Sequence, residues 1–110
     1  MTWVIKMSDA DISTQTLAYT VGASLETLVL VEFCNRSTTA SATVQLWVVP
    51  SGETVGNEHL KENGTQLGLA GSASAVLLRK VIAPASAKIY VQASTSNVSC
   101  QVSGDETAVT

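Results

Sequence analysis

The sequence predicts an all-β protein, folded as one antiparallel β-sandwich of Greek-key or jelly-roll type with seven or eight short strands. Apolar residues recur with a period of two along most of the chain, the helical period is almost absent, and clusters of Gly, Ser, Asn and Pro separate the apolar segments. The 110 residues suit one domain and are too few for two. We therefore expect residues 1–110 to form a single domain.

The chain is expected to begin with two short strands. Residues 3–7 (WVIKM) form either a strand or part of an N-terminal arm that covers residues 1–10. Residues 17–21 (LAYTV) form the second strand, and a Gly-Ala-Ser turn follows it. Such an arm could add a strand to the open sheet edge of a neighbouring molecule.

The third expected strand is the longest and starts at residue 25. Its odd positions give an apolar core face of Val29, Val31 and Phe33. Its even positions include Leu28 and Leu30, which indicates a strand that is covered on both faces over part of its length.

The fourth expected strand, 43–49, has two contrasting faces. Val44, Leu46 and Val48 form the core face, whereas the opposite face carries Gln45, Trp47 and Val49. Proline cannot donate to a strand ladder, so Pro50 ends this strand.

The second half of the chain is expected to begin with a long irregular loop, 51–74, which contains five glycines and one helical turn near residues 58–62. Three further strands follow at 75–82, 87–94 and 98–104. We expect the acidic tail, 105–110, to be frayed.

Charge and hydropathy exclude two kinds of partner. The net charge is −3, and Arg79-Lys80 is the longest basic run, so the basic stripe typical of nucleic-acid-binding proteins is missing. The longest apolar stretch, 25–34, contains two glutamates and is too short to span a membrane. The first residues lack the apolar region of a secretion signal, so we expect synthesis in a cytoplasm without export by the standard route.

The two cysteines and three Asn-X-Ser/Thr patterns fit that compartment. Cys100 lies on an apolar strand face and is expected to be a small buried hydrophobic residue, with a Cys34–Cys100 disulfide as the less favoured alternative. The patterns that begin at Asn35, Asn63 and Asn97 are expected to be chance matches.

A search for catalytic or metal-binding residues finds little. His59 is the only histidine, and no serine lies in a nucleophile-elbow motif, so a loop histidine exposed to solvent is favoured over a catalytic one. Cys and His residues are too few for a structural zinc site. Asp9 and Asp11 give at best a weak calcium pattern. We expect no enzyme activity, no metal and no cofactor.

The surface therefore has to carry the function, and aromatic residues are the first candidates. The predicted protein-interface residues are Trp47, Tyr90, Trp3, Gln45 and Val49, with Trp47 as the anchor because its strand has a complete core face without it. The competing interpretation is that the 51–74 segment of the same chain folds over Trp47. The sequence does not decide between the two.

Residues 25–106 resemble small β-sandwich structural proteins of tailed bacteriophages. The resemblance lies in the order of the motifs in FCNRSTTASATVQLWVVPSGETVGNEHL and VLLRKVIAPASAKIYVQASTSNVSCQVSGDE. It departs from the pattern at Ala85-Ser86, where such proteins often have a Gly-Asp turn. The family has no catalytic residue to carry over.

The resemblance implies a virion component: a head decoration (cement) protein or a neck-, tail- or fibre-associated protein. It implies binding to capsid or tail proteins of the same virus and a homo-oligomer, with a trimer favoured. The alternative is a carbohydrate- or receptor-binding sandwich of a tail or fibre, in which exposed Trp and Tyr stack on sugar rings. A small hydrolase that uses His59 is the third and least favoured hypothesis.

Overall fold

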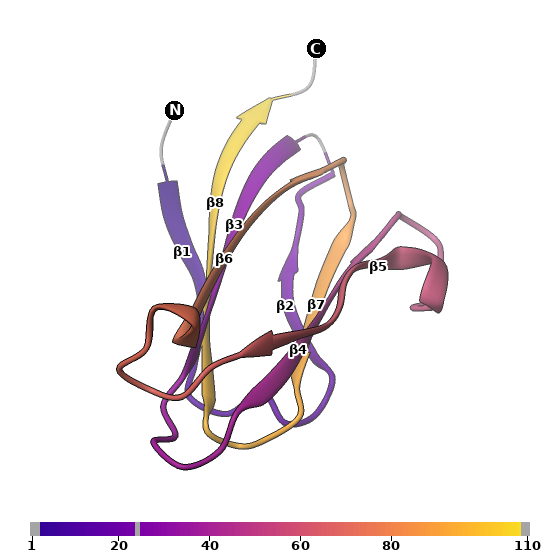
Figure 1. Cartoon of the computed structure of the whole chain (residues 1–110). Helices are drawn as coiled ribbons and strands as arrows, with labels where there is room; N and C mark the ends of the chain where they lie inside the picture. The colour runs from indigo at the N-terminus through magenta and orange to yellow at the C-terminus, as the bar shows by residue number, and fades with distance from the viewer. Residues whose placement is uncertain (1–2, 24, 109–110) are drawn as a thin grey trace.

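The computed structural model describes residues 3–23 and 25–108, which form eight antiparallel strands and two short 3-10 helices (Figure 1). This confirms the all-β sandwich. The strands are β1 (Trp3–Asp9), β2 (Thr16–Thr20), β3 (Leu25–Asn35), β4 (Ala42–Val49), β5 (Leu60–Leu67), β6 (Val76–Ala83), β7 (Lys88–Ala93) and β8 (Val98–Ala108). The 3-10 helices are η1 (Asn57–His59) and η2 (Ala73–Ala75).

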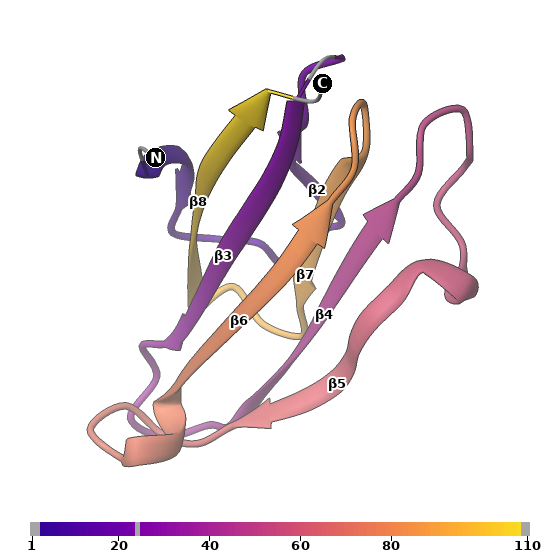
Figure 2. The ribbon, with the colours of Figure 1, turned by 90° about the horizontal axis from the view of Figure 1, so that it is seen from above.

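The strands form two four-stranded sheets in the orders β1-β8-β3-β6 and β2-β7-β4-β5. Counted from the two ends of the chain, the strands pair in order: β1 with β8, β2 with β7, β3 with β6 and β4 with β5. The chain is therefore one long hairpin rolled into two layers, which is the topology of a jelly roll. Figure 2 shows β8, β3 and β6 side by side, with β7, β4 and β5 in the other layer.

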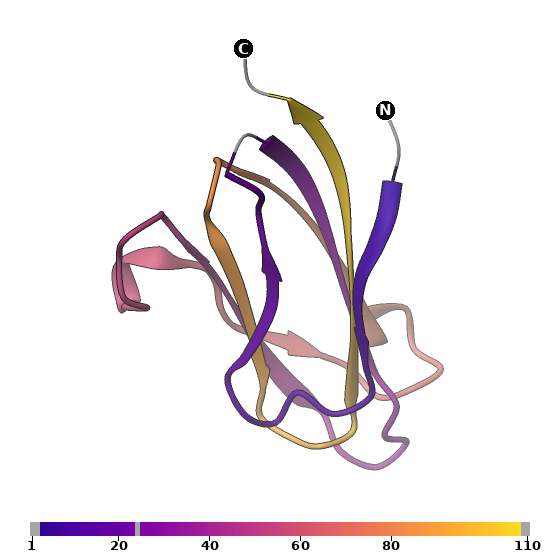
Figure 3. The ribbon, with the colours of Figure 1, turned by 180° about the vertical axis from the view of Figure 1, so that it is seen from behind.

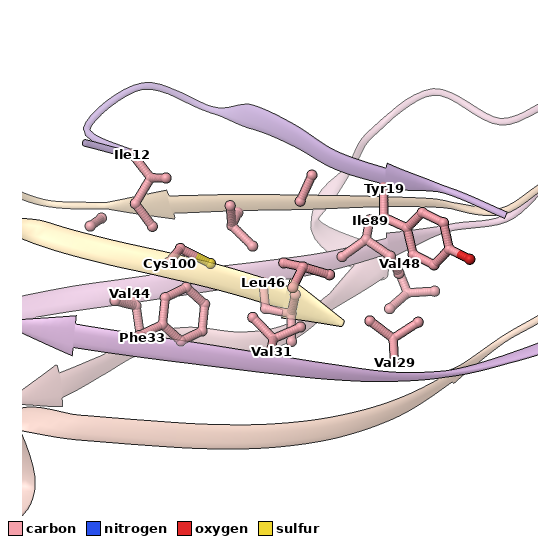
Figure 4. Packing of buried hydrophobic residues seen from close by; sticks show 14 of the residues in the cluster. Ile12, Tyr19, Val29, Val31, Phe33, Val44, Leu46, Val48, Ile89 and Cys100 are labelled. Atoms are coloured by element: carbon pink, nitrogen blue, oxygen red, sulfur yellow. The ribbon is translucent and has the colours of Figure 1, made fainter. Parts of the chain in front are cut away.

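The core fills the space between the two sheets (Figure 4). The predicted inward faces of β3 and β4 are buried as expected, because alternate residues of a strand point to opposite sides of its sheet. From β7 they are joined by Ile89, Val91 and Ala93, none of them more than 3% exposed. Buried aliphatic residues of this kind supply most of the folding free energy of a domain of this size.

Four loops meet at the lower end of the sandwich in Figure 3 and are joined by two adjacent residues. The side chain of Asn35 is fully buried, and its Nδ2 donates to the carbonyl oxygens of Ala40 and Gly68 at 2.9 and 3.0 Å. The guanidinium of Arg36 donates to the carbonyl oxygens of Ala10 and Ser96. Because Asn35 is inaccessible, its Asn-X-Ser pattern is unsuitable as a glycosylation site in the folded chain.

Two sequence-based expectations about segments need correction, and an alternative left open is decided. The supposed irregular loop 51–74 contains the strand β5, which the sequence pattern missed because LKENGTQL is polar and only Leu67 of it is fully buried. The expected frayed tail, 105–110, is wrong for residues 105–108. These residues belong to β8, which pairs with β3. Of the two alternatives for the start of the chain, a strand or an arm, the structure has the strand: residues 3–9 form an edge strand paired with β8 of the same chain. Residues 1–2 and 109–110 lie outside the described residues.

The two cysteines are free, and they lie on opposite faces of one sheet. Cys100 pairs with Phe33 and points into the core, whereas Cys34 pairs with Ser99 and points outward. The alternative of a Cys34–Cys100 disulfide is therefore wrong. Burial, assisted by the carboxylates of Asp9 and Glu32, raises the pKa of the Cys100 thiol to about 12.

Candidate functional site

The outer side of the β1-β8-β3-β6 sheet carries an unusual number of apolar side chains. We call this surface the apolar face and define it by seven residues. They are Trp3 and Ile5 from β1, Leu28 and Leu30 from β3, and Val76, Leu78 and Ile82 from β6. The strand register places Trp3, Asp105, Leu28 and Ile82 in one row across all four strands, and Ile5, Ser103, Leu30 and Lys80 in the next.

Most of the large exposed apolar side chains of the described residues lie on this face. Ile82 is 69% exposed, Ile5 61%, and Val76, Leu78 and Trp3 between 45% and 49%. Only Leu17 and Leu69 of the same class lie elsewhere. The strand β8 contributes the polar residues Ser103 and Asp105 between β1 and β3, so the apolar residues form two groups, one on β1 and one on β3 and β6. Scattered apolar residues are normal on a protein surface, but several on one side of a sheet make that side a candidate contact surface.

The apolar face has few charged groups, and they lie close together. Glu32 of β3 pairs with Leu78, and Lys80 of β6 pairs with Leu30, so the two charged side chains are diagonal neighbours. Both are exposed, and among the described residues no ion pair joins them. Asp105 is only 2% exposed, and its Oδ1 lacks a hydrogen-bond partner. An open hollow at the far end of the face is lined by Ser8, Asp9, Glu32, Cys34, Ser99 and Gln101.

The predicted anchor Trp47 lies on the opposite sheet and is buried, with 6% of its surface exposed. Val49, on the same strand face, is 1% exposed, and Tyr90 and Gln45 are half-buried. Trp47 and Val49 lie on the outer strand face, as predicted, but they are buried, so the expectation that they are exposed contact residues is wrong. Trp3, by contrast, is exposed as predicted, but it lies on the other sheet and cannot share a surface with Trp47.

The chain itself covers Trp47, as the competing interpretation proposed. The helix η1 contacts β4, and Leu60, at the start of β5, pairs with Trp47 (Figure 2). His59 is 5% exposed, which corrects the expectation of a solvent-exposed loop histidine. Its Nδ1 accepts a hydrogen bond from the Gly56 backbone N–H at 3.1 Å, and its Nε2 lies 3.0 Å from Glu53 Oε1. Both ring nitrogens thus hold the 50–59 loop in place.

The two layers are also joined at their open side, between the edge strands β5 and β6. The guanidinium of Arg79 donates to the carboxylate of Glu62, which also accepts a hydrogen bond from the hydroxyl of Thr65. Burial alone would raise the pKa of Glu62, but the hydrogen bonds from Thr65 and Arg79 together hold it below its ordinary value. This ion pair has a structural role and lies away from the apolar face.

The outer side of the β2-β7-β4-β5 sheet has a smaller, polar hollow. It is lined by Thr43, Gln45, Gly64, Gln92, Ala93 and Ser94. The Gln45 amide donates to Asn63 Oδ1 and the Gln92 amide to the carbonyl oxygen of Ser13, both at 3.3 Å. Tyr90, two residues from Gln92 on the same strand face, lies next to this hollow.

The acidic loop after β1 uses its carboxylates locally. Asp9 Oδ1 accepts a hydrogen bond from the Asp11 backbone N–H, and Asp11 Oδ1 accepts one from that of Ser13. Hydrogen bonds from the Ser13 hydroxyl and backbone lower the pKa of Asp11. Within residues 3–23 and 25–108, no group of three or more His, Cys, Asp or Glu side chains is arranged to hold a metal ion. No helix in the same described ranges has the length and apolar character needed to cross a bilayer.

Comparisons of this chain with protein-family models, with curated proteins and with solved structures gave no match. The resemblance to phage structural proteins therefore rests on the order of the sequence motifs alone.

Proposed function

We propose that this protein is a non-catalytic structural subunit of a tailed-phage virion, made in the cytoplasm of the host bacterium, that works by binding capsid or tail proteins and its own copies. The observation that carries the proposal is the apolar face. Its seven apolar side chains lie on one outer side of a sheet, and covering apolar surface with another surface is favourable because it removes that surface from water.

The chemistry of the rest of the chain supports a role in binding. A general base needs a free ring nitrogen, and His59 uses both of its nitrogens to hold the 50–59 loop.

A head, neck, tail or fibre position is compatible with a small jelly roll, an architecture that occurs in viral capsid proteins. Many copies attached to one particle gain affinity through multivalency, so each single contact can be weak.

The test is incorporation into particles of the virus that encodes the chain. Mass spectrometry of purified virions should detect the protein, and recombinant protein added to particles that lack it should sediment with them. Ile82→Glu, on the apolar face, should weaken co-sedimentation, because it places a charge in the surface that a virion protein or another copy of the chain covers. The matched control is Leu17→Glu, which changes a residue of similar kind on the opposite sheet and should leave co-sedimentation intact. Absence of the chain from purified virions would contradict the proposal.

The second candidate is carbohydrate binding at the polar hollow beside Tyr90. Amide and hydroxyl groups next to a half-exposed aromatic ring are the combination that binds sugars by hydrogen bonding and stacking. Glycan-array binding that is lost in Tyr90→Ala and kept in Ile82→Glu would support this candidate. Trp47→Ala is unsuitable for the test, because Trp47 is buried and its loss would disturb the fold.

A further inference from the structure

We propose that the apolar face is covered by a second copy of this chain, in a two-fold dimer that packs the two β1-β8-β3-β6 sheets face to face. The proposal deepens the proposed function, since it names the occupant of the same surface. Three observations carry it: the irregular or charged sheet edges, the area of the face and the arrangement of its charges.

The sheet edges are poorly suited to pairing with another molecule. The ladders of β1 and β2 are each interrupted by a register shift, and that of β5 by two. Irregular edges of this kind discourage strand addition. The strand β6 has a regular ladder, but Lys80 lies at its centre and is exposed, whereas its neighbour Arg79 is paired with Glu62. Antiparallel pairing of two β6 strands about a two-fold axis at Lys80 would place the two lysines opposite each other. The face, rather than an edge, is therefore the surface left for association.

The outer side of the whole β1-β8-β3-β6 sheet, which includes the apolar face and the polar residues of β8, is large enough for a specific dimer. Four strands about 4.8 Å apart and about eight residues long cover a flat area of about 500 Å². Two such faces in contact cover about 1,000 Å² before side-chain relief is counted, which reaches the lower limit for a specific interface. Stacked sheets pack about 10 Å apart when the side chains between them interdigitate, and branched apolar residues such as Ile5, Leu30 and Ile82 suit that packing.

The two exposed charges of the face are complementary when two copies meet about a two-fold axis. Glu32 and Lys80 are one acid and one base in adjacent rows, and both are exposed. A two-fold axis that passes between them brings Glu32 of one copy against Lys80 of the other, twice in the dimer. A two-fold axis also brings a surface against itself, so no second complementary surface is required. A trimer, which the family resemblance favours, needs two different surfaces that fit each other.

Sedimentation equilibrium of the full chain, from about 1 µM to about 1 mM, tests the inference. The wild type should reach twice the 11.4 kDa mass of one chain. Ile82→Glu should raise the dimer dissociation constant about tenfold or more, while Leu17→Glu should leave it unchanged. Circular dichroism checks that both variants are folded, as expected for substitutions at positions that are 69% and 46% exposed.

A charge-reversal cycle tests the pairing itself. Glu32→Lys and Lys80→Glu should each weaken the dimer about tenfold, because each places like charges together, and the double reversal should restore it. A monomer at every concentration, a trimer, or equal effects of Ile82→Glu and Leu17→Glu would overturn the inference. If a wild-type monomer still sedimented with particles, only this inference would fail. If the chain formed the dimer in solution but were absent from purified virions, only the proposed function would fail.

Discussion

Replacing Asn35 with alanine should destabilise the protein by about 3 kcal/mol. The buried side chain makes three hydrogen bonds to the backbone: Nδ2 donates to the carbonyl oxygens of Ala40 and Gly68, and Oδ1 accepts from the Ser37 N–H at 3.1 Å. Each such bond contributes about 1 kcal/mol, and the alanine leaves all three backbone groups without this partner. For a domain near 100 residues, that loss lowers the melting temperature by about 10–20 °C.

The aspartate substitution at the same position sharpens the test. Asn35→Asp keeps the acceptor for the Ser37 N–H, but its second carboxylate oxygen faces two carbonyl oxygens. The folded state therefore favours the protonated acid, and the pKa of the aspartate rises above the unfolded value of about 3.9. The variant should therefore lose stability as the pH rises through that range, and its deficit should be smaller at pH 4 than at pH 7.

Urea unfolding followed by circular dichroism measures both effects. The control is Asn97→Ala, which changes an exposed asparagine at the same end of the sandwich and should cost less than about 0.5 kcal/mol. A deficit for Asn35→Ala below about 1 kcal/mol, or a deficit for Asn35→Asp that does not change with pH, would refute the role of Asn35 as the connector of these loops.

Three further predictions concern other parts of the molecule. Arg79→Met should cost about 1–2 kcal/mol at pH 7 in urea unfolding, a modest value because the arginine is partly exposed. Because the pKa of Glu62 is lowered in the folded state, its stabilisation is present above its unfolded pKa and is lost as the pH falls, so this cost should shrink at pH 3. Cys100, with a pKa of about 12, should resist iodoacetamide in the native protein at pH 8 and react after unfolding, as mass spectrometry of peptides will show. His59→Ala should loosen the 50–59 loop and expose Trp47, and an emission spectrum that does not move to the red would contradict this.

The strand pattern in the sequence predicted the parts of the fold that bury one apolar face. In β3 and β4, alternate Val, Leu and Phe residues indicate both the strand and its inward side, and the structure confirms them. The strand β5 escaped prediction because it is an edge strand with polar residues on both sides. Its position depends on pairing with β4, which local sequence does not encode.

The exposure of Trp47 was predicted incorrectly for a related reason. The exposure of Trp47 depends on where the 50–59 loop lies, and the hydrogen bonds of His59 that fix this loop are not visible in the sequence pattern. The sequence also contained a signal for the apolar face. Leu28 and Leu30 occupy the second face of β3, and Leu78 and Ile82 lie beside them on β6. Apolar residues on both faces of neighbouring strands indicate a sheet whose outer side is also covered.

The most direct test of the apolar face as the contact surface uses the two tryptophans of the chain. Trp3 lies on the face and is 45% exposed, whereas Trp47 is buried under its own loop. In Trp47→Phe, acrylamide should quench Trp3 strongly in dilute protein and weakly once the chain associates, while in Trp3→Phe the quenching of Trp47 should be weak throughout. Quenching of Trp3 that stays the same between dilute and associated protein would contradict the account.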